Sequence, residues 1–267
     1  MAIPQVLTIA GSDSGGGAGI QADIKAIQAN GCYALSVVTS VTAQNTMNLI
    51  GASDVPLKIV EAQLNAVFAD FNIAAVKTGM LSSKEIVECV AAKLQKVSLK
   101  WLVVDPVMIS KSGFTLLQDE AVESMKKELF SIAALVTPNV PEAEALTGKR
   151  IRDIEAVKEA AKTIMDTGCG AVLIKGGHLI GDPVDVFFDG SNFELFEAER
   201  ITTKNTHGTG CTYASAITAN LALGLGKKEA IAKSKTYVTN AIKHSLDIGH
   251  GYGPVDHFYF LREGYKK

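Results

Sequence analysis

The chain has 267 residues, of which 47% are hydrophobic and 20% charged, a balance typical of a globular domain with a buried core. Its formal net charge of -2 supplies no positive field, so we expect neither nucleic acid nor an anionic membrane as a partner. The four cysteines are dispersed, without metal-ligand spacing, as in reduced cytoplasmic proteins. We find no leader and no apolar run near the roughly 18–20 residues of a membrane helix, and expect a cytoplasmic protein.

The first strand is predicted at residues 5–10, where a β-branched run ends at Gly11. The glycine-rich loop that follows has neither the G-K-[ST] of a Walker A loop nor the G-x-G-x-x-G of a dinucleotide site. The loop therefore offers only a close approach of backbone to a ligand. The next predicted helix, residues 20–30, places Asp23 near its first turn, where a carboxylate can serve the helix dipole alone.

A second strand, predicted at residues 33–43, runs into the polar cluster Gln44-Asn45-Thr46. Ligands bind at the carboxyl ends of the strands in parallel α/β sheets. The Gln44 amide both donates and accepts, so it could read an amine and a ring nitrogen together. The alternative is a loop amide that faces water.

Strands and helices alternate along the rest of the chain. Helices are predicted at 56–70, from a Ser82/Glu85 capping box to 94, and at 119–129, 139–148, 154–167 (capped by Asp153), 210–223 and 228–245. Strands are predicted at 74–78, 101–105, 134–137 and 171–175, with a hairpin of 184–188 and 193–196, and loops at 109–113 and 249–253. This order predicts one α/β domain over residues 1–267, with a mostly parallel sheet covered on both faces.

The segment from His207 to Thr212 (HGTGCT) stands just before a helix of small residues. Gly208 and Gly210 allow a tight turn with uncovered N–H groups, and a helix N-terminus adds donors and a positive dipole end. We therefore expect an anion site for a phosphoryl group, with Cys211 handling a proton and its thiol pKa lowered by the dipole. A plain glycine turn with a small buried cysteine is the alternative.

Further polar residues stand at the end of other predicted strands or at the start of predicted helices: Asp105, Asn139 with Glu142, and Lys175. These ends converge on one edge of such a sheet. Phosphoryl transfer needs a carboxylate for Mg²⁺, a cation and N–H donors for the phosphates, and a base for the attacking hydroxyl. The set therefore predicts a phosphotransferase.

Several segments, in order, resemble the signatures of hydroxymethylpyrimidine and phosphomethylpyrimidine kinases of the ribokinase superfamily. The segments are residues 8–23 (TIAGSDSGGGAGIQAD), 42–46 (TAQNT), 77–80 (KTGM), 105–108 (DPVM), 137–139 (TPN), 175–178 (KGGH) and 207–212. The resemblance extends from about residue 5 to about residue 245. It implies a three-layer α/β/α ribokinase-like fold and, as in most such kinases, a homodimer.

The resemblance also implies roles for individual residues. The Gly208–Cys211 backbone would hold the transferring phosphoryl group, and Cys211 would be the general base, at a position where many relatives have Asp. ATP phosphates would meet Lys175, Asp105 and Thr209, and Mg²⁺ would be organised by Asp105, Asn139 and Glu142. The substrate, an aminopyrimidine alcohol or its monophosphate on the route to thiamine diphosphate, would contact Gln44, Asp23, Met80 and Gly11.

Two other functions are considered. Some pyridoxal kinases of this group have Cys at the position of Ser110. Ser110 and the residues around Gln44 therefore favour the pyrimidine as substrate. The alternative is a vitamin B6 kinase, or an enzyme with both activities. A pyrimidine or nucleotide sensor without turnover would be expected to lack Cys211, Asp105 or the glycine pair, and all are present.

Overall fold

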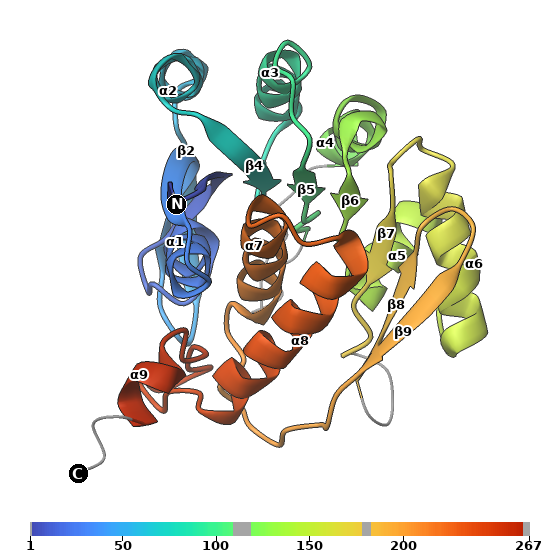
Figure 1. Ribbon diagram of the computed structural model, residues 1–267. Helices are drawn as coiled ribbons and strands as arrows, with labels where there is room; N and C mark the ends of the chain where they lie inside the picture. The colour runs from blue at the N-terminus through green and yellow to red at the C-terminus, as the bar shows by residue number, and fades with distance from the viewer. Residues whose placement is uncertain (1, 109–118, 178–182, 264–267) are drawn as a thin grey trace.

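The computed structural model describes residues 2–108, 119–177 and 183–263, and its strands form one nine-stranded sheet (Figure 1). The sheet order is β3-β2-β1-β4-β5-β6-β7-β8-β9. The strands from β2 to β7 in this order pair in parallel, and β3, β8 and β9 pair antiparallel at the two edges. The bounds are β1 Gln5–Asp13, β2 Tyr33–Gln44, β3 Leu49–Asp54, β4 Ile73–Thr78, β5 Leu102–Val104, β6 Leu135–Val136, β7 Val172–Ile174, β8 Val184–Phe188 and β9 Phe193–Glu197.

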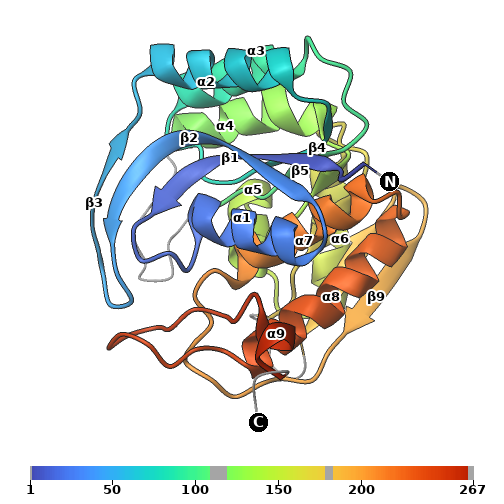
Figure 2. The ribbon, with the colours of Figure 1, turned by 60° about the vertical axis from the view of Figure 1, so that its left-hand side comes forward.

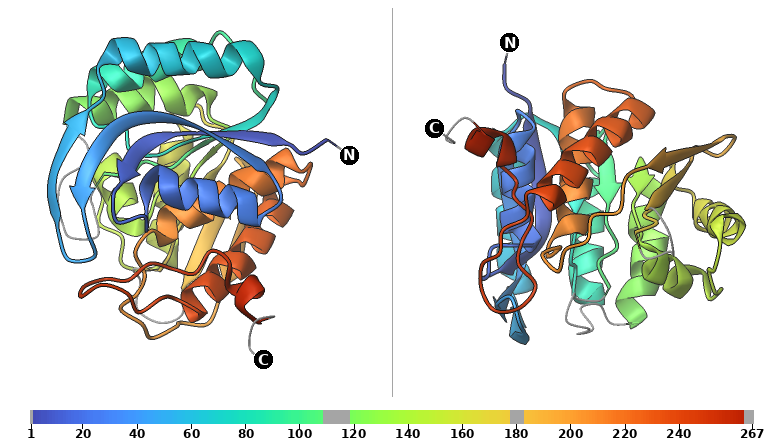
Figure 3. Two further views of the ribbon diagram at one scale, coloured as in Figure 1. Left: turned by 90° about the vertical axis from the view of Figure 1, so that its left-hand side faces the viewer. Right: turned by 90° about the horizontal axis from the view of Figure 1, so that it is seen from below.

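Helices cover both faces of this sheet (Figure 2 and Figure 3). One layer holds α2 (Leu57–Asp70), α3 (Lys84–Leu94), α4 (Asp119–Ser124), α5 (Val140–Thr147) and α6 (Ile154–Met165). The other holds α1 (Gly19–Ala29), α7 (Thr209–Ala222) and α8 (Lys227–Lys243), with α9 (Tyr259–Glu263) near the C-terminus. The three-layer α/β/α class expected from the sequence is therefore confirmed. None of the helices in these described ranges is long and apolar enough to cross a membrane.

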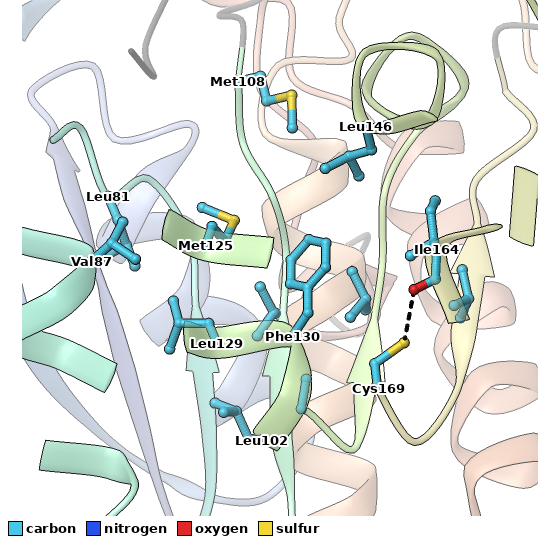
Figure 4. Close-up of a cluster of buried hydrophobic side chains, with 14 of the residues drawn as sticks. Leu81, Val87, Leu102, Met108, Met125, Leu129, Phe130, Leu146, Ile164 and Cys169 are labelled. Atoms are coloured by element: carbon cyan, nitrogen blue, oxygen red, sulfur yellow. Dashed lines mark hydrogen bonds between the residues drawn. The ribbon is translucent and has the colours of Figure 1, made fainter. Parts of the chain in front are cut away.

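The core follows the two-residue period of the strands. In β5, Leu102 and Val104 pack toward the α2–α6 layer, whereas Val103 packs toward α7 and α8. A continuous π-helical and 3₁₀ stretch after α4, Met125–Leu129 and Phe130–Ile132, adds fully buried side chains to the first of these cores (Figure 4). Both faces of the central strands are buried, which explains why these strands read as unbroken apolar runs.

The strand order places the ligand-binding edge. From β1 the chain crosses to β2 on one side, and later returns to β4 on the other side of β1. The point where the direction of winding changes leaves a crevice beyond the carboxyl ends of β1 and β4. Gly11 lies near the end of β1, and Gly79 and Met80 follow β4 directly.

Several predicted local features differ from the structure. The polar cluster after Gln44 is the turn of a β2–β3 hairpin, in which Asn45 Oδ1 accepts the N–H groups of Met47 and Asn48 at 2.9 Å each. Strand β1 continues past Gly11 to Asp13, with a register shift between Ala10 and Ser12.

The predicted cap of α3 is displaced by one residue. Ser83, not Ser82, is the N-cap, while the Ser82 hydroxyl bonds to Asp54 of the hairpin. The predicted loop at 109–113, with Ser110, and the final residue of the 175–178 motif, His178, lie outside the described residues.

Candidate active site

A cavity of about 940 Å³ opens at the carboxyl edge of the sheet. This volume is typical of a site for a small molecule together with a cofactor. The cavity is lined by all but one of the residues that the sequence analysis singled out, among them Gly11, Gln44, Met80, Asp105, Asn139, Glu142, Lys175, Gly208, Thr209, Gly210 and Cys211. Segments spread over 200 residues of sequence therefore meet in one place, as the parallel topology predicts.

The turn into α7 is built around Gly208. This residue is the N-cap of α7, with φ 78°, and a Cβ there would overlap the carbonyl group of Gly17. Only glycine meets both conditions. The first N–H groups of α7 have no acceptor within the helix, and the residues from Gly208 to Cys211 line the cavity at the positive end of the helix dipole. Thr209 Oγ1 donates to the carbonyl oxygen of Thr206 at 2.8 Å, which fixes the turn.

Cys211 lies in the first turn of α7, but its thiol is not acidic. Burial raises the pKa of Cys211 to about 11, and the carboxylates of Asp23 and Asp105 add to this against the opposing effect of Lys77. The expectation that the helix dipole lowers this pKa is therefore wrong. Desolvation and two nearby negative charges outweigh the dipole and the lysine.

Lys175 and Asp105 form a close ion pair beside Gly210. Lys175 Nζ lies 2.6 Å from Asp105 Oδ1, which also accepts the Thr137 hydroxyl at 3.1 Å. A Cβ on Gly210 would lie 3.4 Å from this ammonium and 4.0 Å from Asp105 Oδ2. The absence of a side chain at Gly210 thus leaves a channel from the α7 turn to a cation and a carboxylate.

Asn139 and Glu142 close the same wall and form a capping box. Asn139 Oδ1 accepts the Glu142 N–H at 2.9 Å, and Glu142 Oε2 accepts the Asn139 N–H at 2.8 Å. Burial raises the pKa of Glu142 to about 7, Lys175 opposes this rise, and Asp105 adds to it. The N-x-x-E spacing therefore has a structural role at the start of α5 as well as a place in the cavity.

The residues present fit a divalent cation held largely through water. No cluster of three or more His, Cys, Asp or Glu side chains in the described ranges could enclose a metal directly. Two buried carboxylates, Asp105 and Glu142, nevertheless disfavour each other's charge, and a cation between them would relieve this repulsion. Oxygen ligands with several retained waters are what Mg²⁺ prefers.

Gln44, Met80 and Gly11 line the same cavity, and Gln44 Nε2 lies 3.4 Å from Nε2 of His207, directly before the α7 turn. Gln44 is held by its backbone, since its N–H donates to Ser14 Oγ at 2.8 Å and its carbonyl accepts the Ser14 hydroxyl at 2.6 Å. A Cβ at Gly11 would overlap the Met80 methyl group, so the thioether side chain lies flat against β1. An amide and an apolar surface thus face one space, as a flat heterocycle requires.

Two residues in this region carry no role in the sequence analysis. Asp13 accepts the N–H groups of Gly15 (2.8 Å), Gly17 (3.0 Å) and Ala18 (2.8 Å), and its other neighbour is His207 Nε2 at 2.8 Å. Burial raises the pKa of Asp13, but these hydrogen bonds prevail and lower it. These three N–H groups of the glycine loop therefore bind Asp13 and are not available to a phosphate group. An acidic residue two positions before the glycine run was the available signal.

Asp23 is the predicted contact that the structure does not bring to the cavity wall. Its side chain is fully buried and pairs with Lys77, whose Nζ lies 2.8 Å from Asp23 Oδ2. Lys77, present only as part of a motif in the sequence analysis, lines the cavity in its place. The signal for a buried ion pair was a lysine within an apolar strand, since Lys77 follows the run AAV (residues 74–76) directly.

Comparisons with known proteins agree with this geometry. A model of the phosphomethylpyrimidine kinase family matches residues 13–256. The hydroxymethylpyrimidine/phosphomethylpyrimidine kinase of Haemophilus influenzae is 47% identical over 266 residues, which cover 97% of this chain and 98% of that protein. The thiamine biosynthesis bifunctional protein ThiED of Geobacter sulfurreducens is 53% identical over 253 residues, 94% of this chain, and the chain spans about half (52%) of that protein's length.

A solved structure extends the comparison to a second activity. The pyridoxal kinase of Staphylococcus aureus in complex with AMP-PCP and pyridoxal superposes with a TM-score of 0.90 at 36% identity, covering 98% of this chain and 96% of that one. The family model, the relatives and the fold all indicate a kinase of this family. This chain belongs to the phosphomethylpyrimidine kinase family and is a phosphotransferase with a ribokinase-like fold.

Proposed function

We propose that the chain transfers the γ-phosphoryl group of ATP to 4-amino-5-hydroxymethyl-2-methylpyrimidine and then to its monophosphate, for thiamine diphosphate synthesis. One observation carries the proposal: a single cavity is lined by the hydrogen-bonding amide of Gln44 and by the α7 turn with Lys175 and Asp105. A flat amino-heterocycle bound at Gln44 would direct a hydroxymethyl group toward that turn.

The residues at the turn divide the work of phosphoryl transfer. The N–H groups of Gly208 to Cys211 would bind the equatorial oxygens of the phosphoryl group as its charge spreads, and Lys175 and Thr209 would bind the nucleotide phosphates. Cys211 Sγ would take the proton of the attacking hydroxyl. Its pKa of about 11 makes the thiolate scarce at neutral pH but strongly basic.

We propose Mg²⁺ as the cofactor that accompanies ATP. Asp105 would hold the ion, together with Glu142 and Asn139 through water. When bound, the ion would neutralise part of the phosphate charge. In the free chain, Lys175 partly compensates the same two carboxylates. Lys175 is thereby held at the part of the cavity wall where the ATP phosphates would bind.

Pyridoxal phosphorylation is the second candidate. Its support is the close superposition on a structure with bound pyridoxal and AMP-PCP. Pyridoxal also carries a hydroxymethyl group on a flat ring, so the same cavity and the same turn would serve it. We place the pyrimidine first because the Gln44 amide offers both a donor and an acceptor to an aminopyrimidine edge.

The Gln44→Ala variant tests this order. We expect kcat/KM to fall roughly 10–100-fold with the aminopyrimidine, because two ring contacts are lost, and clearly less with pyridoxal. Asn48→Ala is the matched control, since Asn48 is an exposed amide of the same hairpin that does not line the cavity. Equal losses on both substrates would argue against Gln44 as the residue that reads the ring.

We also propose a cytoplasmic homodimer. Exposed apolar side chains gather on the edge hairpin, with Val41 53%, Met47 49% and Ile50 77% exposed. An edge strand with such a surface invites pairing with a second copy. Light scattering should give twice the monomer mass, and Ile50→Glu should give a monomer; a monomeric wild type at micromolar concentration would refute the proposal.

A further inference from the structure

Lys77 is a buried cation that the proposed chemistry does not use. It is the largest fully buried side chain of the described residues, and it nevertheless borders the cavity. Its Nζ lies 2.9 Å from Asp23 Oδ1 and 2.8 Å from Asp23 Oδ2. Burial disfavours the ammonium, but the Asp23 carboxylate holds the pKa of Lys77 above its ordinary value. The lysine is therefore a permanent charge at this wall.

Asp23 in turn is fixed by hydroxyl groups. Its carboxylate accepts Thr8 Oγ1 at 2.6 Å and Ser215 Oγ at 2.7 Å, besides the ammonium. Asp23 and its three partners come from α1, β1, β4 and α7, so the pair ties both sides of the crevice together. Ser215 stands one helical turn after Cys211 on the same face of α7. The pair thus lies directly behind the reacting end of the cavity.

The pair has a direction. Lys77 borders the cavity and Asp23 does not, so the lysine is the member of the pair nearer to a ligand. Both side chains are fully buried, so the ammonium would act on a ligand through its charge. The ammonium has three N–H donors, and the two Asp23 oxygens account for two of them. A Cβ on Gly79 would lie 2.7 Å from Nζ, so the glycine after Thr78 leaves room for the ammonium.

Lys77 and Lys175 act on the same short stretch of α7. Both ammonium groups interact electrostatically with Cys211, while Asp105 and Glu142 supply negative charge near Lys175. The two proposed substrates differ most at this point: the alcohol brings a neutral hydroxyl, and the monophosphate brings about -1.5 to -2 charges. A fixed dipole in a low-dielectric wall distinguishes such ligands strongly.

We infer that the Asp23–Lys77 pair is a positioning and selectivity device that favours the monophosphate over the alcohol, and so supports the second phosphoryl transfer. This inference rests on the proposed function. The pair acts through its field and through the α7 turn that it braces.

The test is the ratio of kcat/KM for the monophosphate to kcat/KM for the alcohol. Asp23→Asn removes the carboxylate that keeps the buried Lys77 ammonium charged, so the ratio should fall. The double variant Asp23→Asn/Lys77→Met removes the dipole without stranding a buried charge, so the ratio should fall about tenfold below wild type. The control is Asp185→Asn/Lys235→Met, which removes a similar buried pair (2.7 Å) from another part of the cavity wall and should leave the ratio unchanged.

The ratio separates the effect of the charge from mere loosening of the site. A structural role alone would move both substrates together, so an unchanged ratio in both Asp23 variants overturns the inference, as does a rise in either. Melting temperatures confirm folding, and if the double variant does not fold, the fall in Asp23→Asn alone decides. Wild-type turnover of neither pyrimidine would instead overturn the proposed function, and this inference with it.

Discussion

Cys211 shows how the position of a residue can be predicted from sequence while the pKa of its side chain is misjudged. Its place at the first turn of α7 follows from the glycine pattern, and a helix N-terminus by itself lowers a thiol pKa. The raised pKa depends on burial and on the carboxylates of Asp23 and Asp105, which arrive from α1 and from the end of β5. No local sequence window contains that information.

Substitution of Cys211 tests its proposed role as base. We expect Cys211→Ala to lower kcat roughly 10²–10⁴-fold while pyrimidine binding persists. Because the thiol pKa is about 11, the thiolate fraction and wild-type kcat should rise with pH between 7 and 9. Cys211→Asp, with a carboxylate ionised across that range, should restore part of the rate and remove the slope.

Rates at each pH under saturating ATP and pyrimidine provide the measurement. Near-normal turnover of Cys211→Ala would eliminate the base role. A wild-type rate that is flat with pH beside a slow Cys211→Asp would indicate that the thiol only positions the hydroxyl.

At the scale of elements, the central strands and the β8–β9 hairpin were predictable, and the β2–β3 hairpin at the other edge was not. Strands β4 to β7 are buried on both faces and read as short apolar runs between turns. Strand β3 (LIGASD) is mostly exposed and contains a glycine, so neither apolar continuity nor alternation marks it. Its turn closes through Asn45, a contact that the sequence offers only as a polar cluster.

The turn at the start of α7 makes a prediction about stability. Gly208→Ala should destabilise the fold by at least about 2 kcal/mol more than Gly224→Ala, measured by urea unfolding. Both glycines have positive φ, 78° and 95°, and flank the same helix. A Cβ at Gly224 meets no atom within 4 Å, whereas one at Gly208 meets the backbone of Gly17 and Ala18. Equal losses would show that the conformation alone, and not the contact with the glycine loop, demands glycine.

At the scale of the whole molecule, the winding of the sheet explains why the candidate site residues could be expected from sequence to meet in one cavity. Each of these residues stands directly after a strand or at the start of a helix: Asp105, Lys175, the Asn139–Glu142 box and the α7 turn. Parallel topology brings such positions to one edge of the sheet. The family and enzyme class expected from the ordered motifs are likewise confirmed. Asp13, His207 and Lys77 were missed because each acts through a partner distant in sequence.

The most direct measurement is ADP release with the hydroxymethylpyrimidine, its monophosphate and pyridoxal under identical Mg·ATP conditions, with products identified by mass. We expect turnover of both pyrimidines, a diphosphate product from the alcohol after long incubation, and a higher kcat/KM for the pyrimidine alcohol than for pyridoxal. Turnover of pyridoxal alone, or of the alcohol without its monophosphate, would contradict the proposed function.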